Sequence, residues 1–222
     1  MFENQKILCF PGWSYSLKIK EWFGHEVECI DHFEQMDLLT DKEKIKSLLP
    51  KNEKWGLLTW SMGTWMGLSL NEIWKDNPPS FWIALAPFTN FCGENAVKEK
   101  ELSLLQKSFK RKPKETLEHF RKKHGGVSVL KNEIFSDSNM HCLHTSLNSL
   151  NNVPMIKSKI SCPVLILYGE NDTLVSRTMV NSFYGLCTHA EMKVYGELTH
   201  ELLYEEPECI KNDLSLFMNK VF

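Results

Sequence analysis

Three polar residues, Ser61, Asp172 and His200, each follow a short apolar run, and together their side chains could carry out nucleophilic catalysis. A serine hydroxyl is a weak nucleophile at neutral pH. It becomes effective when an imidazole accepts its proton and a carboxylate holds that imidazole in the required tautomer. The sequence therefore predicts a catalytic triad in which Ser61 is the nucleophile, His200 the general base and Asp172 the residue that orients the base.

The serine lies where an apolar run passes directly into a segment with helical spacing, in Thr59-Trp60-Ser61-Met62-Gly63. A nucleophile elbow requires small residues beside the serine, because the strand and helix backbones come close together at a strained turn. Gly63 meets this requirement on one side, whereas Thr59 occupies the position at which the usual pattern has its first glycine. Taken alone, the motif is equally consistent with a serine that caps the following helix.

The aspartate and the histidine also follow apolar runs. Asp172 ends a Gly-x-x-Asp turn that begins at Gly169, and His200 lies between the last apolar run and the C-terminal helical segment. The carboxyl ends of parallel strands form the edge at which open α/β sheets bind ligands. Each residue alone could be an ordinary turn aspartate or a solvated loop histidine. The chain order serine, aspartate, histidine matches the α/β-hydrolase arrangement and favours the triad.

Such a triad also needs backbone N–H donors for the negative charge that develops on the carbonyl oxygen of the substrate. The amide of Met62, directly after the nucleophile, is one candidate. The second donor is expected in the loop after the first strand, where Gly12 lets the chain turn back and Trp13 follows. We predict an oxyanion hole formed by the amides of Trp13 and Met62. The alternative is a simple turn with a core tryptophan.

Apolar runs that are typical of strands alternate with longer segments that have helical spacing. The predicted strands are 7–10, 27–30, 55–59, 81–86, 164–168 and 192–195. The predicted helices among them are 41–49, 62–74, 178–184 and 207–221. Nearly continuous apolar strands separated by helices indicate a parallel sheet that is covered on both faces. The predicted fold class is therefore α/β.

A helical insertion interrupts this alternation. It contains no clear strand but three helical segments, at 98–111, 114–123 and 138–150. A chain of 222 residues is too short for two large domains. We therefore predict one α/β core formed by residues 1–87 and 156–222, with residues 88–155 as a helical cap.

Composition limits the classes of function. With 42% hydrophobic residues and a formal net charge of −2, the chain resembles soluble globular proteins and not nucleic-acid binders. Its seven cysteines form no Cys-x-x-Cys pair and are expected to be reduced, and no apolar run is long enough to cross a membrane. We expect a cytoplasmic protein that binds neither nucleic acid nor membranes.

No metal or cofactor is expected either. His141 and His144 have the i, i+3 spacing of a ligand pair, but no further cluster of ligands lies near them in the sequence, which favours an ordinary helix surface.

Four short segments carry a family resemblance. They read Pro-Gly-Trp-Ser at 11–14, Trp-Ser-Met-Gly at 60–63, Tyr-Gly-Glu-Asn-Asp-Thr-Leu-Val at 168–175 and Thr-His-Glu at 199–201. They resemble the α/β-hydrolase family and, more narrowly, the pimeloyl-acyl-carrier-protein methyl ester esterases of biotin synthesis. The similarity extends over nearly the whole chain, including the position of the cap. It implies an α/β-hydrolase fold, with a mostly parallel sheet flanked by helices and a helical cap insertion.

The resemblance also implies an activity. A chain of this subgroup hydrolyses the methyl ester of pimeloyl-acyl carrier protein through an acyl-enzyme, without a cofactor. Ser61, His200 and Asp172 would have the triad roles given above, and the rings of Trp13 and Trp60 would border the acyl pocket.

The charge distribution fits an acidic partner. Residues 98–131 contain eleven lysines and arginines and four acids, a local net charge of +7, which would attract an acyl carrier protein and its phosphopantetheine phosphate. The expected contacts are Lys107, Lys110, Arg111, Lys114, Arg121 and Lys122. A solvated helical face is the alternative.

Other functions stay open. The same triad would serve a hydrolase of a free small ester or thioester, and a non-catalytic relative could use the pocket for binding. In either case we expect a monomer.

Overall fold

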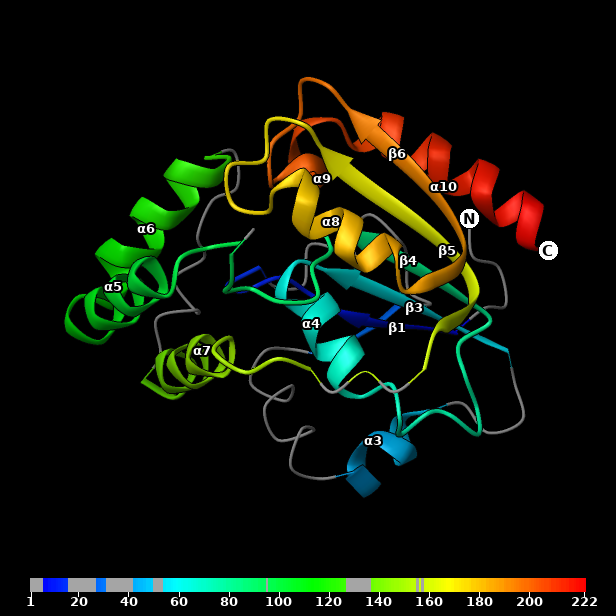
Figure 1. Cartoon of the computed structure of the whole chain (residues 1–222), viewed down its shortest axis with the longest axis horizontal. Helices are drawn as coiled ribbons and strands as arrows, with labels where there is room; N and C mark the ends of the chain where they lie inside the picture. Colours follow the sequence, from blue (N-terminus) through cyan, green and yellow to red (C-terminus); the bar gives the residue numbers. More distant parts are fainter. Residues whose placement is uncertain are drawn as a thin grey trace.

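The structure is a computed structural model, and it describes residues 6–15, 27–30, 42–49, 54–94, 96–126, 137–154, 156 and 158–222 (Figure 1). All the predicted site residues lie within these ranges. The last part of the basic stretch, residues 127–131, lies outside the described residues.

Six parallel strands form one sheet in the order β2-β1-β3-β4-β5-β6. The strands are β1 (Lys6–Phe10), β2 (Val27–Cys29), β3 (Trp55–Trp60), β4 (Phe81–Leu85), β5 (Ile160–Gly169) and β6 (Cys187–Tyr195). Every residue of β3 and β4 is buried. These two strands are covered on both faces of the sheet, which explains why their sequences are nearly continuously apolar. The predicted α/β class is confirmed.

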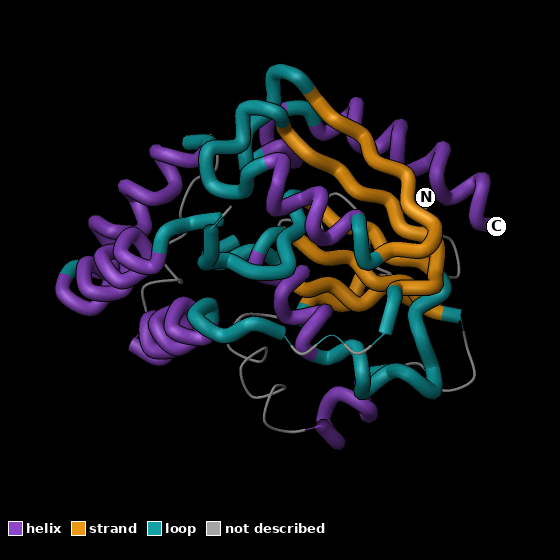
Figure 2. The backbone as a smooth tube through the Cα atoms, in the orientation of Figure 1, coloured by secondary structure: helices purple, strands orange, loops and turns teal. Residues whose placement is uncertain are grey.

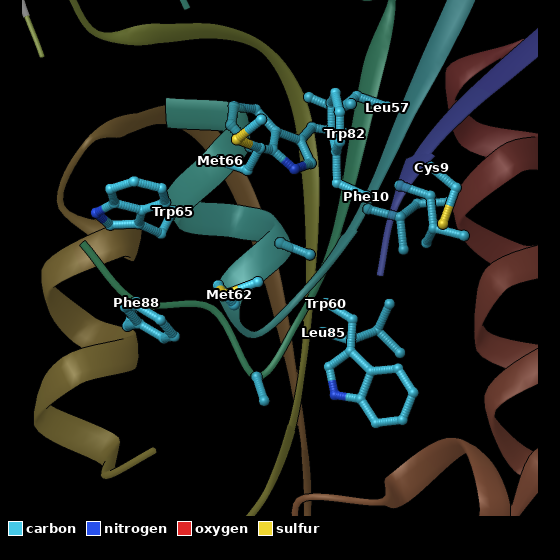
Figure 3. Packing of buried hydrophobic residues seen from close by; sticks show 14 of the residues in the cluster. Cys9, Phe10, Leu57, Trp60, Met62, Trp65, Met66, Trp82, Leu85 and Phe88 are labelled. Carbon is cyan, nitrogen blue, oxygen red and sulfur yellow. The ribbon is translucent and has the colours of Figure 1, made fainter. Parts of the chain in front are cut away.

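Helices cover both faces of the sheet (Figures 1 and 2). The helices of the core are α3 (Lys42–Leu48), α4 (Met62–Ser69), α8 (Arg177–Tyr184), α9 (Leu202–Glu205) and α10 (Pro207–Val221). Figure 3 shows α4 on one side of the strands and α10 on the other, with the buried side chains of Trp82 and Phe10 among them. None of the described helices combines the length and the apolar character that crossing a membrane would need.

Three further helices, which we call the cap helices, come between β4 and β5 in the chain. They are α5 (Glu99–Arg111), α6 (Pro113–His124) and α7 (Asp137–Ser149). They lie beyond the carboxyl ends of the strands, toward which the arrows point in Figure 1. Helices α5 and α6 bury narrow apolar faces, for example Phe109 of α5 and Phe120 of α6, and leave their lysines exposed to water.

Three element boundaries differ from the prediction by four residues or more. Helix α4 ends at Ser69 and not at Trp74, because the chain turns at Leu70 and the Asn71 carboxamide accepts a hydrogen bond from the Trp74 indole at 3.2 Å. Such local side-chain bonds compete with a continuing helix. Strands β5 and β6 begin earlier than predicted. The first residues of β6 are half-buried or exposed at the edge of the sheet, so they lack a continuous apolar sequence.

Candidate active site

Ser61 occupies a tight turn between β3 and α4. Its backbone has φ 53° and ψ −115°, a positive φ that residues with a side chain rarely adopt. Its amide donates to the carbonyl of Leu85 at 2.9 Å. A Cβ on Gly63 would lie 1.8 Å from the carbonyl oxygen of Phe10, so only glycine lets α4 pack this closely against the end of β1. This contact gives the physical reason why position 63 needs a small residue, as the sequence predicts.

Thr59, the departure from the usual elbow, has partners of its own. Its buried hydroxyl accepts hydrogen bonds from the Trp82 indole at 2.8 Å and from the Thr64 hydroxyl at 3.0 Å. The absence of a side chain on Gly67 leaves room for both neighbours, because a Cβ there would lie 2.9 Å from the Trp82 ring and 3.4 Å from the Thr59 methyl. Gly67, one helical turn after Gly63, therefore supplies the space that a glycine at position 59 would otherwise provide.

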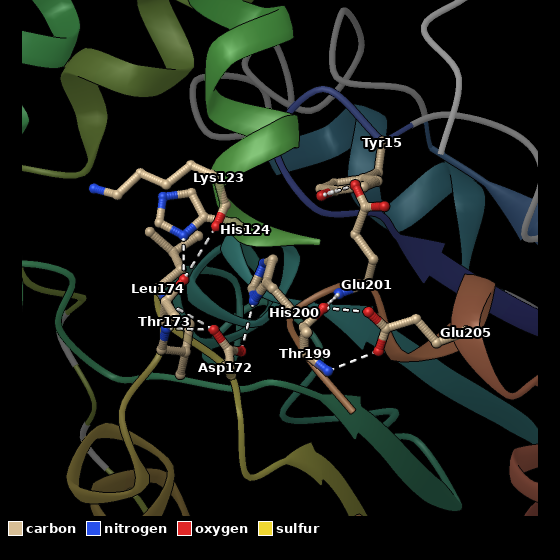
Figure 4. Close-up of polar contacts among 11 residues, drawn as sticks. Tyr15, Lys123, His124, Asp172, Thr173, Leu174, Thr199, His200, Glu201 and Glu205 are labelled. Carbon is tan, nitrogen blue, oxygen red and sulfur yellow. Dashed lines mark hydrogen bonds and ion pairs between the residues drawn. The ribbon is translucent and has the colours of Figure 1, made fainter. Parts of the chain in front are cut away.

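His200 and Asp172 form a buried pair. His200 Nδ1 lies 2.7 Å from Asp172 Oδ2, and the other carboxylate oxygen accepts hydrogen bonds from the amides of Leu174 and Val175 at 2.8 and 2.9 Å (Figure 4). Both oxygens are thus held in place. The carboxylate fixes the ring orientation and places the proton on Nδ1, so Nε2 is left as the basic nitrogen.

A close approach of two loops creates this pair. A Cβ on Gly169 would lie 2.4 Å from the carbonyl oxygen of Leu198 and 2.6 Å from that of Thr199. The amide of Asn171 donates to the same Leu198 carbonyl at 3.0 Å. Glycine at the end of β5 therefore lets the loop that carries the aspartate lie directly against the loop that carries the histidine.

Ser61 shares one small cavity with His200. Both residues line a hollow of about 10 Å³, together with Trp13 and Met62. Within the described residues no hydrogen bond joins the Ser61 hydroxyl to His200. Catalytic hydrogen bonds of this kind are often long in the absence of substrate and tighten when it binds. The structure thus joins two of the three predicted triad residues directly and places the third on the same cavity wall.

The two predicted oxyanion-hole residues also line this cavity. Met62 is the first residue of α4, where backbone N–H groups have no partner within the helix. Trp13 lies in a turn closed by a 2.9 Å hydrogen bond from the Tyr15 amide to the Gly12 carbonyl. Its indole donates to the carbonyl of Leu143 in α7 at 3.0 Å, which fixes the ring against the cap helices.

Trp60 does not have the predicted place in the acyl pocket. The centre of its fully buried ring lies 4.2 Å from that of Tyr15 and 6.2 Å from that of His200, in tilted arrangements. The ring is absent from the cavity wall. Successive strand residues point to opposite faces, so the residue before the nucleophile faces away from Ser61. Among the described residues the Trp60 indole N–H has no hydrogen-bond partner. Trp13 is the tryptophan that borders the cavity.

A larger groove continues from this cavity along α5 and α6. It encloses about 670 Å³ and shares Phe91, Leu105, Phe120 and Leu174 with the cavity beside Ser61. Apolar side chains line much of it. Its charged lining side chains are Arg111, Lys112, Lys123, Glu101 and Glu115.

Five of the six predicted carrier contacts are exposed on α5 and α6, namely Lys107, Lys110, Arg111, Lys114 and Lys122. Arg121 is the exception, and its prediction as a surface contact is wrong. Only 6% of the residue is accessible, and its guanidinium lies 3.7 Å from the Glu201 carboxylate in the interface between α6 and the core. Arg121 lies within a run of basic residues, which suggests an exposed position, but it follows Phe120 on the inner face of the helix.

Three residues near the triad were missed in the sequence. Glu201 is fully buried and accepts a 2.7 Å hydrogen bond from the Tyr15 hydroxyl. Burial raises the pKa of Tyr15 well above its usual range, so this hydroxyl keeps its proton. His124, at the end of α6, lies 2.8 Å from the Thr173 hydroxyl, and burial lowers its pKa to about 4. The one signal for Glu201 is its position directly after His200.

Within the described ranges, no group of three or more histidine, cysteine, aspartate or glutamate side chains could hold a metal ion. His144 stacks on Phe109, with ring centroids 6.3 Å apart, and His141 is exposed on the same helix.

The fold and the buried pair define an α/β hydrolase of the serine type. A sequence profile of the family described as Serine aminopeptidase, S33 matches residues 30–207. The chain belongs to this family of α/β hydrolases and is a serine hydrolase. No curated protein sequence matches it at a significant level.

Solved structures with a similar fold include esterases and a thioesterase. An esterase (EaEST) from Exiguobacterium antarcticum is 16% identical with a TM-score of 0.72, over 97% of this chain and 92% of that one. A thermophilic esterase from Thermogutta terrifontis is 12% identical with a TM-score of 0.72, over 98% and 90%. The RedJ thioesterase of the prodiginine pathway of Streptomyces coelicolor is 11% identical with a TM-score of 0.61, over 96% and 89%. At these identities the likeness shows a shared fold.

Proposed function

We propose that the chain is a carboxylesterase that hydrolyses the methyl ester of a pimeloyl group carried by acyl carrier protein. The observation that carries the proposal is the 2.7 Å contact between His200 and Asp172 on the cavity that Ser61 lines. The resemblance of four motifs to the esterases of biotin synthesis supplies the substrate.

The proposed reaction has two stages, which form and then hydrolyse an acyl-enzyme on Ser61. Ser61 Oγ attacks the ester carbonyl while His200 Nε2 takes its proton, and the amides of Trp13 and Met62 bind the oxyanion. His200 returns the proton to the departing methoxide, and methanol leaves an acyl-enzyme. A water molecule then attacks the acyl carbonyl, His200 takes the proton of the water and returns it to Ser61, and the free carboxylate is released.

The groove along α5 and α6 supports a long substrate attached to a carrier. The apolar side chains of its lining suit an acyl chain, and Arg111, Lys112 and Lys123 suit a phosphate. The exposed lysines of the same two helices suit an acidic protein surface. A small free ester would leave most of the 670 Å³ unused.

Thioester hydrolysis is the second candidate. The triad chemistry is the same, and the similar solved structures include a thioesterase. Carrier-linked thioesters would use the same groove, but with the thioester and not the distal ester at Ser61.

A fluorophosphonate probe and two substrates distinguish these functions. We expect the native chain to be labelled and the Ser61→Ala variant to be inert, since labelling requires an activated hydroxyl. With pimeloyl-acyl carrier protein methyl ester we expect methanol as the product. Release of free acid from the carrier would favour the thioesterase, and an unlabelled native chain would favour binding without catalysis. Complementation of a biotin-requiring strain without its own esterase tests the same reaction in cells.

A further inference from the structure

The last turn of α6 reaches all three loops of the proposed active site. Arg121 contacts the loop of Trp13 and the loop of His200, and His124 contacts the loop of Asp172. Residues from the cap helices thus meet the catalytic groups, although the sequence separates α6 from each of these loops by tens of residues.

Arg121 is the centre of these contacts. Its Nε donates to the Ser14 hydroxyl at 3.1 Å, and a terminal nitrogen of the same guanidinium donates to the Ser14 carbonyl. Its Nη1 lies 3.7 Å from Glu201 Oε1, the oxygen that also accepts the Tyr15 hydroxyl. The guanidinium stacks on the Tyr15 ring at 3.7 Å from the ring centre.

The chemistry of this cluster requires an arginine. The guanidinium is planar and carries several donors in a fixed fork, so one group can bind Ser14 and Glu201 at the same time and still stack on a ring. A lysine ammonium lacks this planar fork, so it could not hold both partners in the same geometry and also stack on the ring. With Glu201 fully buried and Arg121 nearly so, loss of either partner leaves an uncompensated buried charge.

The two partners of Arg121 are the neighbours of catalytic groups. Ser14 directly follows Trp13, and its own backbone is held at φ 64°. Glu201 directly follows His200. A shift of either neighbour therefore moves an oxyanion-hole donor or the general base.

We propose that Arg121 is a positioning residue that assembles the active site when α6 docks on the core: it holds the loop of Trp13 and the loop of His200 in their reactive arrangement. This inference rests on the proposed function, because it assumes that Ser61 is the nucleophile.

A third contact supports the assignment. The ring of His124 lies 2.8 Å from the Thr173 hydroxyl, next to Asp172, and that hydroxyl lies 3.5 Å from the carbonyl of Lys123 (Figure 4). A Cβ on Gly125 would lie 2.4 Å from the Glu201 side chain. The end of α6 is therefore packed directly onto the catalytic loops, with Gly125 giving the necessary space.

The test uses a small p-nitrophenyl ester, which needs no carrier protein. For Arg121→Met and Glu201→Gln we expect kcat to fall about 10- to 100-fold while KM changes less than about twofold, because misplaced catalytic groups lower the rate without removing substrate contacts. Labelling of Ser61 by fluorophosphonate should slow by a similar factor. Glu118→Gln, the same change at an exposed site on α6, is the matched control and should keep native rates.

The variants also separate positioning from general stability. Assays run well below the unfolding midpoint of each variant, and Arg121→Lys keeps the charge in case Arg121→Met fails to fold. We expect Arg121→Lys to recover part of kcat and the double variant Arg121→Met/Glu201→Gln to lose no more than the worse single one, since the pair acts as a unit. Folded variants with native kcat and labelling would overturn the inference. An unlabelled native chain would instead overturn the proposed function.

Discussion

Ser61, the proposed nucleophile, has a backbone conformation that opposes stability. A residue with a side chain at positive φ costs about 1 to 3 kcal/mol and persists only where its surroundings impose it. At Ser61 they do, since the amide is bound to Leu85 and α4 begins at the next residue.

Removing the side chain should release this strain. We expect both Ser61→Ala and Ser61→Gly to abolish ester hydrolysis, while Ser61→Gly unfolds at higher urea and is more stable than Ser61→Ala by about 1 kcal/mol. Urea unfolding followed by tryptophan fluorescence measures the difference. Equal stability of the two variants would show that the elbow is unstrained.

At this scale the sequence points to candidate catalytic residues more readily than to the residues around them. Ser61, Asp172 and His200 could be selected as candidates because their residue types and chain order match a known mechanism. The roles of Arg121 and Trp60 depended on which way one side chain points. An arginine within a run of cations suggests a surface, and only the path of α6 across the core shows that this arginine faces inward.

At the scale of elements, the site depends on how closely loops approach one another. Gly169 ends β5 at the point where the histidine loop crosses it. The sequence predicts both strands and both loops, but the distance between them depends on the pairing of β5 with β6, which no local pattern contains.

Gly169→Ala tests this approach. The new Cβ would force the Leu198 and Thr199 carbonyls away, so we expect about a tenfold lower kcat and a loss of about 1 to 3 kcal/mol in the free energy of unfolding. Gly196→Ala, in the neighbouring loop, is the matched control, because no heavy atom lies within 4 Å of its new Cβ. If the two variants behaved alike, the contact would have no role.

The end of α6 should make stability depend on pH. Burial lowers the pKa of His124 from 6.5 to about 4, and His200 and Lys123 act in the same direction. The unfolded chain therefore binds a proton between these two values that the folded chain does not. The stability that the uncharged His124 contributes is therefore fully present above about pH 6.5 and is lost as the pH falls toward 4.

We expect His124→Gln to flatten this dependence. The amide can still pair with Thr173 but does not titrate, so between pH 7 and 4 the variant should lose less stability than the native chain, by roughly 1 to 3 kcal/mol. His189→Gln, the same change at an exposed position, should leave the profile unchanged. Parallel curves for the native chain and His124→Gln in urea unfolding at several pH values would contradict the assignment.

For the whole molecule, the distribution of charge along the chain says more about the expected partner than the net charge does. A net charge of −2 hides a strongly basic segment within residues 98–131. The fold class and the helical insertion could be predicted because they depend on the alternation of strands and helices. The groove could not be predicted, because it forms only where α5 and α6 pack side by side.

Charge reversal tests the role of this surface. We expect Lys107→Glu/Lys110→Glu/Arg111→Glu to lower kcat/KM for the carrier-linked ester at least about tenfold, less so at high salt, and to spare p-nitrophenyl esters. Lys46→Glu/Lys54→Glu/Lys75→Glu, at three exposed sites outside the cap helices, makes the same change in net charge and is the matched control. Equal loss on both substrates would show that these cations act on catalysis and not on docking.

The hollow beside Ser61 leaves room for little more than a single water molecule. An acyl chain can therefore reach the serine only if the side chains that line both the hollow and the groove, Phe91, Leu105, Phe120 and Leu174, move aside. These four side chains thus control access from the groove to Ser61. The rate at which a covalent inhibitor reacts with the serine would report how often they move aside. Smaller residues at these four positions should speed that reaction without changing the catalytic groups.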